Sequence, residues 1–480
     1  MTRAFPMWIG GKQVDGPESL EITSPYDARP VGTTSWASPE QVDDAIAAAD
    51  GVKDEAAGLP IHVRADALSH VSGQIAVRAD EIAELITGEN GKPMVWSRAE
   101  VGRAVSVFRI AAEEARRWSG EAIRLDTDKA AVGRLAYVRR VPRGPVLAIS
   151  PFNFPLNLVA HKVAPAIAVG APLVLKPAPK TPLSALLLAE IIAETDLPAG
   201  MVNVVNVQND QAGDLVADER LPVVSFTGSG PVGWSIQKAV PHKQVTLELG
   251  GNAAAVVCSD WTSDSDLDWA ATRIATFSNY QAGQSCIGVQ RVYVAGPAYD
   301  DFKQRLVSKV EDLKTGDPYD EATQVGPVIN AQAADRIMAW VQEAVDQGAS
   351  MLTGGGRDGS TVEPIVLEGV AADAKVSCDE VFGPVVLVER VADDAAAFAK
   401  VNDSAYGLQA GVFTHDLQKA FHAHRELEVG GVIVGDVPSY RADQMPYGGA
   451  KDSGVGREGI RYAMQDYTYE RVMVLTGLDL

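Results

Sequence analysis

Cysteine is scarce in this chain, with three residues among 480. So few thiols exclude the disulfide framework of a small secreted fold, and free thiols are typical of a reducing cytosol, so we expect a cytoplasmic protein. Positive charge is also in deficit, since 42 lysines and arginines face 63 aspartates and glutamates and give a net charge of −21. This field repels polyanions, which argues against nucleic acid or membrane as the main partner but leaves room for a local anion pocket.

Long hydrophobic runs are missing as well. No uninterrupted apolar stretch approaches the ~18–20 residues of a membrane span, and residues 1–10 lack the pattern of a signal peptide. The balance of 46% hydrophobic and 22% charged residues is typical of a globular protein. At about 150 residues per domain, the length predicts roughly three structural units.

Hydrophobic patterning divides the chain into parts of different character. Up to about residue 120 it predicts mainly helices, and residues 135–141 then form an isolated strand pattern. From residue 146 short apolar strands alternate with helices, and a second alternating set follows residue 251. Such alternation indicates parallel sheets buried on both faces. The last strand pattern, residues 469–475, is outside both sets and could pair with residues 135–141 as an appended flap.

A glycine-rich turn follows one of the predicted strands. Gly228, Ser229 and Gly233 belong to a G-x-G-x-x-G match that opens a predicted helix. The free N–H groups and the dipole of a helix N-terminus favour a phosphate, so we interpret this turn as dinucleotide-binding rather than as a simple tight turn. In a simple Rossmann interpretation, Glu248, 20 residues after Gly228, binds the ribose. Lys176 at another strand end is a candidate ribose or phosphate ligand, or a solvated strand end.

Two loops hold candidate catalytic residues. Cys286 lies in a loop rich in glycine and glutamine (281–288) and is either a nucleophile or a structural cysteine. Asn153 lies between two phenylalanines after a strand, where it is a turn residue or a placed amide donor. Cys258 ends an apolar strand and is expected in the core. The seven histidines form no spaced set, so we expect no metal site.

Seven segments, in order, make the chain resemble the NAD(P)-dependent aldehyde dehydrogenase superfamily along almost its whole length. They are SPFNFPLN (150–157), LVLKPAPKTPLSAL (173–186), FTGSGPVG (226–233), LELGG (247–251), GQSC (283–286), EVFGPV (380–385) and PYGGAKDSGVGREG (446–459). The resemblance implies an α/β aldehyde dehydrogenase fold with a Rossmann-like cofactor domain, an α/β catalytic domain and a small β-strand oligomerisation flap. It places the cofactor domain's helical part at 1–122, a flap strand at 123–143, the nucleotide-binding part at 144–250, the catalytic domain at 251–440 and a return segment with the second flap strand at 441–480.

The same resemblance implies roles for individual residues. Cys286 is the nucleophile that forms a thiohemiacetal and then a thioester, Asn153 donates to the oxyanion, and Glu248 is the general base rather than a ribose ligand. The residues implied for binding of NAD+ or NADP+ are Phe152, Lys176, Gly228, Ser229, Gly233, Leu249, Glu380 and Phe382.

Departures from the family pattern bear on the cofactor and the substrate. Many NAD-preferring members have a glutamate three residues after the lysine, where this chain has Pro179 and then Lys180, so NADP is credible. The segments after Cys286 and around Arg441 look most like the lactaldehyde and non-phosphorylating glyceraldehyde-3-phosphate branch. Arg103 and Arg441 match two arginines that bind the substrate phosphate there, but the other two ligands are replaced by Phe154 and Ser285. The alternative for Arg103 is a surface arginine that binds no substrate.

We therefore expect an enzyme that oxidises a small polar or anionic aldehyde to its acid, acting as a homodimer or homotetramer. A CoA-acylating semialdehyde dehydrogenase is an alternative, although those relatives lack the general base that Glu248 would provide. An inactive binding or structural protein on the same fold is the third interpretation, against which the presence of Cys286, Glu248 and Asn153 argues.

Overall fold

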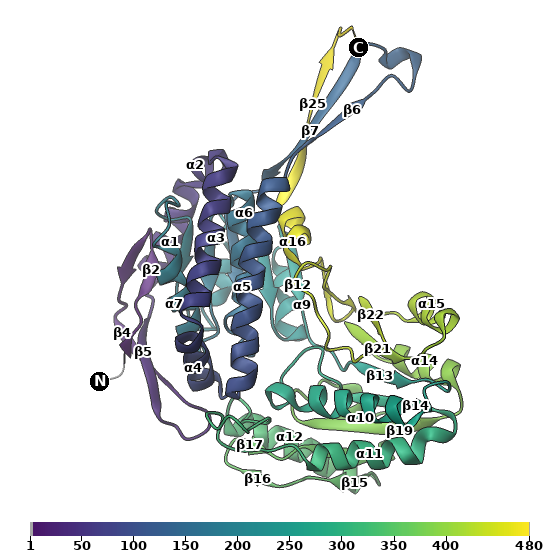
Figure 1. The fold of residues 1–480 in the computed structure, drawn as a ribbon. Helices are drawn as coiled ribbons and strands as arrows, with labels where there is room; N and C mark the ends of the chain where they lie inside the picture. The colour runs from purple at the N-terminus through teal and green to yellow at the C-terminus, as the bar shows by residue number, and fades with distance from the viewer. Residues whose placement is uncertain (1–2, 480) are drawn as a thin grey trace.

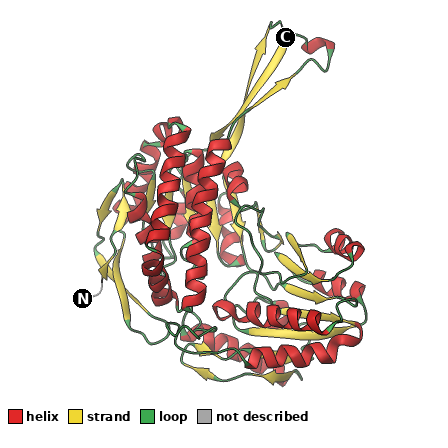
Figure 2. Ribbon diagram, viewed as in Figure 1, coloured by secondary structure: helices red, strands yellow, loops and turns green. Residues whose placement is uncertain are grey.

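The computed structural model describes residues 3–479 and has two α/β halves with a long ribbon of strands that projects from one of them (Figure 1). Helices cover both faces of the two large sheets, whereas the ribbon carries only a short helical turn, Lys129–Ala131, at its tip (Figure 2). Within the described range, no helix is long and apolar enough to cross a membrane.

The first large sheet has eight strands in the order β24-β12-β11-β8-β9-β10-β2-β3. Its five central strands are parallel, and β24, β2 and β3 join antiparallel at the edges. The five run in the order third, second, first, fourth, fifth along the chain, which is the arrangement of a Rossmann unit. The strands are β2 (Met7–Ile9), β3 (Lys12–Val14), β8 (Val146–Ile149), β9 (Leu173–Lys176), β10 (Val202–Val204), β11 (Val223–Thr227), β12 (Gln244–Glu248) and β24 (Gly454–Val455).

The helices of this half bury apolar faces against the sheet. Every residue of α6 is buried, including Pro165 in its interior, because α3, α5 and α16 surround it. The helices are α1 (Pro39–Gly51), α2 (Lys53–Gly58), α3 (Ile61–Val77), α4 (Ala79–Asn90), α5 (Met94–Arg117), α6 (Asn157–Val169), α7 (Leu183–Ile192), α8 (Ala212–Ala217), α9 (Gly230–Ala239) and α16 (Ile460–Asp466).

The second large sheet has seven strands in the order β15-β18-β19-β14-β13-β21-β22, all parallel except β15. Its strands are β13 (Ala254–Val257), β14 (Arg291–Ala295), β15 (Ser350–Thr353), β18 (Ile365–Glu368), β19 (Val385–Val391), β21 (Gln409–Phe413) and β22 (Gly431–Val434). The helices of this half are α10 (Asp264–Asn279), α11 (Tyr299–Glu311), α12 (Ala331–Asp346), α13 (Lys375–Cys378), α14 (Asp394–Asn402) and α15 (Leu417–Glu426).

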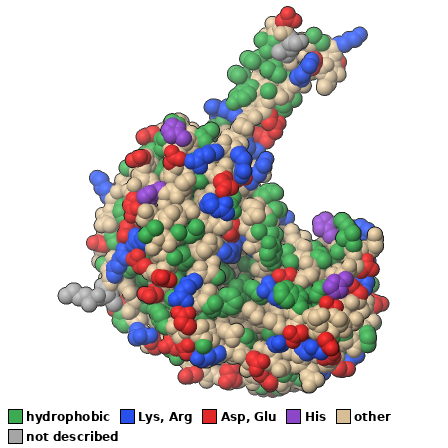
Figure 3. Space-filling model, in the orientation of Figure 1, with side chains coloured by type: hydrophobic (Ala, Val, Ile, Leu, Met, Phe, Trp, Pro, Cys, Tyr) green, Lys and Arg blue, Asp and Glu red, His purple; other side chains and the backbone are tan. Residues whose placement is uncertain are grey.

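The projecting ribbon is a three-stranded antiparallel sheet of β6 (Glu121–Arg124), β7 (Arg134–Pro142) and β25 (Thr468–Thr476). The two strand patterns expected outside the large sheets do pair, from Thr468 opposite Pro142 to Thr476 opposite Arg134. Apolar side chains on the ribbon face solvent, with Val472, Met473 and Val474 each more than half exposed. Figure 3 shows hydrophobic side chains gathered along the projecting ribbon.

The expectation of mainly helices before residue 120 was wrong for the first 36 residues. That stretch contains β1 (Arg3–Ala4), β2, β3, β4 (Glu18–Thr23) and β5 (Pro30–Trp36), of which β1, β5 and β4 form a separate sheet. The strands β1, β2 and β3 have two or three residues each, and β3 and β4 are largely exposed, so the apolar pattern of this stretch is weak. Further short strands are β16 (Arg357–Asp358), β17 (Thr361–Val362), β20 (Tyr406–Gly407) and β23 (Ala450–Lys451). We keep the five-part domain division as a proposal.

Candidate active site

A cavity of about 940 Å³ lies where the carboxyl ends of the parallel strands β8, β9, β11 and β12 meet. In open α/β sheets ligands bind at this end of the strands. All three candidate catalytic residues line it, together with every candidate cofactor residue except Gly233; they are Phe152, Asn153, Lys176, Gly228, Ser229, Glu248, Leu249, Cys286, Glu380 and Phe382. Loops that are far apart in the sequence thus line the same cavity.

The glycine-rich turn follows β11 and starts α9, with Ser229 as the N-cap. Gly233 lies on the first turn of this helix, where a Cβ would clash with the Leu249 side chain, so glycine allows α9 to lie close to the sheet. A Cβ at Gly230 would meet nothing within 4 Å. The turn follows the fourth strand of the Rossmann unit and not the first, so the simple Rossmann assignment of Glu248 to the ribose does not match the strand order.

Lys176 ends β9 as a buried cation at the cavity wall. Its Nζ donates to Asn209 Oδ1 at 2.9 Å, and it has no carboxylate partner within the described part of the chain. Burial lowers the pKa of Lys176 to about 8. Pro179 and Lys180 line the same wall. An unneutralised ammonium beside a helix N-terminus fits the ribose and phosphate portion of a dinucleotide.

Glu380 and Phe382 also line the cavity. The Glu380 carboxylate accepts a hydrogen bond from the Gly251 N–H at 3.0 Å, and burial raises its pKa to about 7. Phe382, with a positive φ of 47°, places its ring edge-on to Phe152 at 5.9 Å between centroids. A left-handed phenylalanine is strained, and such strain persists where the surrounding structure holds a functional geometry.

The loop before Cys286 has an unusual backbone. Gln281, Ala282 and Gly283 have consecutive positive φ values of 55°, 53° and 71°. At Gly283 a Cβ would clash with the Gly383 carbonyl. Cys286 follows with its Sγ 2.9 Å from the Tyr447 hydroxyl. Burial raises the pKa of the thiol to about 12, and the Tyr447 hydrogen bond opposes this rise.

Asn153 is held against the nucleophile loop. Its side-chain Nδ2 donates to the Gln284 carbonyl at 2.9 Å, and its backbone carbonyl accepts from Lys92 Nζ at 2.9 Å. Lys92 forms a fully buried ion pair with Glu100, whose carboxylate also accepts the N–H of Asn157 at the start of α6. The amide therefore has one N–H in use and a second N–H available to a ligand.

Glu248 ends β12 as a buried carboxylate. Neither of its oxygens has a hydrogen-bond partner among residues 3–479. Burial, and then the charge of Glu458, raise the pKa of Glu248 well above its usual range. Glu458 itself is bound by Lys162 at 3.0 Å and Arg441 at 3.1 Å, which hold its pKa well below the usual range despite burial. Two nearby carboxylates thus differ in acidity because only one has cations.

Neither candidate substrate arginine is among the residues that line the 940 Å³ cavity, and the two differ in setting. Arg103, expected either in the site or on the surface, is about one-third exposed and paired with Asp443 at 2.8 Å. Asp443 also contacts His161 Nε2 at 3.2 Å. Arg441 is buried, and its Nε has no hydrogen-bond partner in the described chain. Burial lowers the pKa of His161 to about 4, so its ring is neutral at pH 7.

Sequence reasoning missed Tyr447, Glu458 and Lys162 as parts of this site. Tyr447 and Glu458 lie inside the recognised segment 446–459, and their backbones hydrogen-bond to each other. The signal was therefore present in this segment, in which a tyrosine and a glutamate stand among the glycines. Lys162 lies within the apolar sequence of α6, where a charged residue is rarely buried without a partner.

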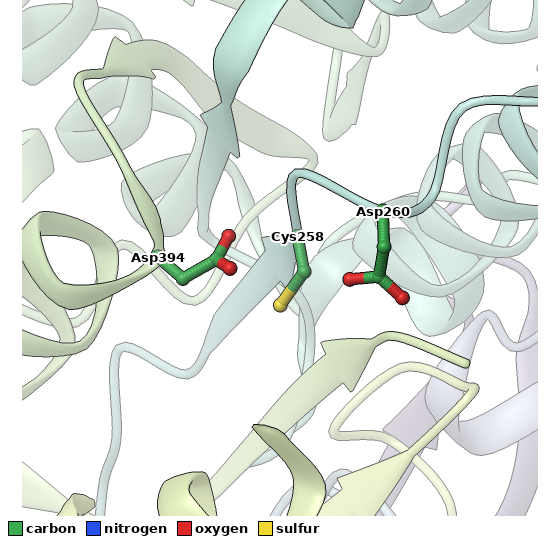
Figure 4. A group of neighbouring side chains, drawn as sticks. All are labelled: Cys258, Asp260 and Asp394. Atoms are coloured by element: carbon green, nitrogen blue, oxygen red, sulfur yellow. The ribbon is translucent and has the colours of Figure 1, made fainter. Parts of the chain in front are cut away.

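A second cluster, Cys258, Asp260 and Asp394, has ligand atoms within 4.8 Å of one another (Figure 4). Lys419 Nζ lies 2.8 Å from Asp260 and 2.6 Å from Asp394, so the protein's own ammonium group bridges the two carboxylates. Cys258 is buried in the core as expected, and burial raises the pKa of its thiol well above the usual value.

Comparison with known proteins places the whole chain in one group. Residues 12–473 match the aldehyde dehydrogenase family. The chain is 41% identical to 3-sulfolactaldehyde dehydrogenase of Priestia megaterium over 98% of both chains. It superposes with a TM-score of 0.97 on aldehyde dehydrogenase 21 of Physcomitrella patens in complex with the reaction product succinate, at 43% identity, covering 100% and 99% of the two chains. NADP-dependent glyceraldehyde-3-phosphate dehydrogenase of Bacillus halodurans, complexed with NADP, gives 0.95 at 34% identity, covering 99% and 100%.

Proposed function

The chain belongs to the aldehyde dehydrogenase family, and from that premise we propose that it oxidises a small polar or anionic aldehyde to the carboxylic acid with NAD(P)+. The observation that carries the proposal is the convergence of Cys286, Asn153 and Glu248 on one cavity that also holds the buried Lys176 ammonium. A thiol, an amide donor, an unpaired carboxylate and a site for an anionic cofactor are what this oxidation needs.

Cys286 attacks the aldehyde carbon as a thiolate and forms a tetrahedral alkoxide. The second N–H of the Asn153 amide donates to that oxygen, a contribution that is worth about 3–4 kcal/mol per donor in comparable sites. Bound nicotinamide supplies the acceptor for the hydride that leaves the tetrahedral carbon. A thioester on Cys286 remains.

Glu248 then removes a proton from the water that attacks the thioester. Its raised pKa makes it a stronger base than an exposed carboxylate, and its two unpartnered oxygens leave room for that water. Glu248 then passes this proton to the departing sulfur, so hydrolysis releases the carboxylic acid and restores both the thiol and the carboxylate.

The cofactor would lie along the cavity from Lys176 to Glu380. Lys176 and the N-terminus of α9 would hold the ribose and phosphates of the adenosine half, and Glu380 would accept from the nicotinamide ribose. Pro179 provides no carboxylate to repel a 2′-phosphate, and Lys180 adds a positive charge, so we propose that NADP is accepted as well as NAD.

Unpartnered polar atoms support a polar substrate. Arg441 Nε, His161 Nδ1 and the whole Asn157 amide are buried without hydrogen bonds to any described residue. Asn157 and His161 are four residues apart on α6 and so share a face. Buried donors without partners are costly, and a bound ligand removes that cost. Because two phosphate ligands of related enzymes are replaced by Phe154 and Ser285, a carboxylate, sulfonate or hydroxyl group is favoured as much as a phosphate.

The exposed ribbon supports a homo-oligomer. The adjacent side chains Val472, Met473 and Val474 would be covered if the ribbon packed on a second copy of the chain, as a dimer or a tetramer. Light scattering gives the mass in solution, and a monomer at micromolar concentration would contradict this part of the proposal.

A rate screen tests the activity. Succinate semialdehyde, 3-sulfolactaldehyde, lactaldehyde, glyceraldehyde 3-phosphate and propanal are each supplied with NAD+ or NADP+, and reduced nicotinamide and acid product are quantified. We expect an anionic aldehyde to exceed propanal in kcat/KM. Product formed only as an acyl-CoA when CoA is added would favour the acylating alternative, and no oxidation of any aldehyde would favour an inactive protein.

A further inference from the structure

One residue outside the set assigned so far touches the reacting atom. The Tyr447 hydroxyl lies 2.9 Å from Cys286 Sγ, and the tyrosine is only 3% exposed. Its backbone is fixed by two hydrogen bonds to Glu458, with N–O distances of 3.0 and 2.7 Å. The contact therefore joins a rigid segment to the nucleophile.

The Tyr447 ring contacts apolar side chains and a guanidinium group. Ile287 and Leu408 form a small buried cluster with it, against which Cys286 packs. The guanidinium carbon of Arg441 lies 3.8 Å from the ring centroid, and Arg441 is itself anchored on Glu458. A cation over the face of a phenol withdraws electron density, so it strengthens the hydroxyl as a hydrogen-bond donor.

We propose that Tyr447 is a further catalytic residue, whose hydroxyl donates a hydrogen bond to the sulfur of Cys286 and stabilises its thiolate. This inference rests on the proposed function, because it concerns the nucleophile of that reaction. Burial raises the pKa of Tyr447 well above its usual value, so the phenol keeps its proton and acts as the donor, not as a base.

The surroundings of the thiol explain why a donor is needed. The charged and titratable groups that act on Cys286 are Glu248, Glu380, Arg441 and Tyr447. The two carboxylates and burial raise the thiol pKa, whereas the Tyr447 hydrogen bond and the Arg441 charge lower it. Tyr447 is the neutral member of this set and makes a direct contact with the sulfur.

The pH profile of alkylation by iodoacetamide tests this role without aldehyde or cofactor. The parent carries Cys378→Ala to remove the exposed thiol, and labelling of Cys286 is read by peptide mass. In Tyr447→Phe we expect the apparent pKa of Cys286 to rise by about one to two units, the loss expected for a hydrogen bond to a charged group. At neutral pH the thiolate fraction falls about 10- to 100-fold, but a more basic thiolate is a better nucleophile, so the alkylation rate there falls by about 3- to 16-fold.

Tyr280→Phe is the matched control. Tyr280 is also buried beside the nucleophile loop, but its hydroxyl bonds Ser285 Oγ at 2.5 Å and not the sulfur. Its alkylation profile is expected to keep the parent pKa. Replacement of Tyr447 by 3-fluorotyrosine keeps the ring and the hydroxyl but makes the hydroxyl a stronger hydrogen-bond donor. The apparent pKa of Cys286 should therefore fall.

Three results would overturn the inference: an unshifted profile in Tyr447→Phe, an equal shift in Tyr280→Phe, or a uniform rate loss at every pH. The fluorotyrosine enzyme decides the matter if the phenylalanine variant does not fold, since no shift or an upward shift there would also contradict it. Because alkylation requires neither substrate nor cofactor, a failed rate screen with a shifted alkylation profile would remove the proposed function and leave this contact.

Discussion

Lys162 and Glu458 form an ion pair of 3.0 Å in which both side chains are almost completely buried. The pair holds Glu458 in its ionised form beside Glu248. A fixed negative charge disfavours a second one nearby, so the arrangement keeps the pKa of Glu248 high. An ion pair that does not itself contact the sulfur thereby affects the basicity of the group that would activate water.

Neutralising Glu458 should therefore shift the acid limb of the pH profile of deacylation, the pH range in which the rate falls as Glu248 is protonated. Glu458→Gln removes the charge that raises the pKa of Glu248, so the pH below which the rate falls should decrease. Leaving Lys162 and Arg441 without this anion should also cost about 3–5 kcal/mol of stability. Stopped-flow deacylation against pH and urea unfolding measure the two effects. Glu55→Gln, an exposed acid on α2, is the control, and an unmoved acid limb would rule out the coupling.

Glu248→Gln tests the general base directly. The amide is nearly isosteric but cannot accept a proton, so acylation should proceed while hydrolysis slows by about 10²–10⁴-fold. Intact-mass measurement after mixing with aldehyde and cofactor should detect a thioester on Cys286. If Glu248 bound the ribose instead, cofactor affinity would fall and no acyl-enzyme would build up.

Cys286→Ala should abolish turnover and leave cofactor binding intact, because the other cavity residues remain. Fluorescence titration with NADPH checks the second part. Cys378→Ala is the control, since Cys378 is exposed on α13 and distant in sequence from the nucleophile loop. Near-normal oxidation by the Cys286 variant would exclude covalent catalysis.

The sequence predicted the central strands better than the contacts among the polar side chains of the site. The strands β9 and β19 fall in the two alternating sets that the sequence predicts after residues 146 and 251, because short apolar runs between glycine, proline and helix patterns are unambiguous. The contact of Tyr447 with Cys286 spans 161 residues, and no local pattern predicts it. Strands of two or three residues such as β2 and β24 carry no period and were missed.

Pro179→Glu should shift cofactor preference toward NAD. A carboxylate at this wall of the cavity would accept from the ribose hydroxyls and repel a 2′-phosphate. Charge-assisted hydrogen bonds of ~1.5–3 kcal/mol make the expected change in the ratio of kcat/KM values about 10- to 100-fold. Pro179→Gln supplies polarity without charge and should shift the ratio less. Equal ratios in the parent and the glutamate variant would show that residue 179 does not contact the ribose.

Removal of the two arginines should distinguish charged from neutral aldehydes. Arg441 Nε is buried without a partner in the described residues, and Arg103 lies nearby on Asp443. If they hold the anionic end of the substrate, Arg441→Met and Arg103→Met should each raise KM for a charged aldehyde far more than for propanal. The larger effect belongs to Arg441, because water competes less for a buried guanidinium. Arg109→Met, on the exposed face of α5, is the matched control and should leave both KM values unchanged. Equal effects on charged and neutral aldehydes would mean that the arginines only support the fold, and the anionic-substrate proposal would be abandoned.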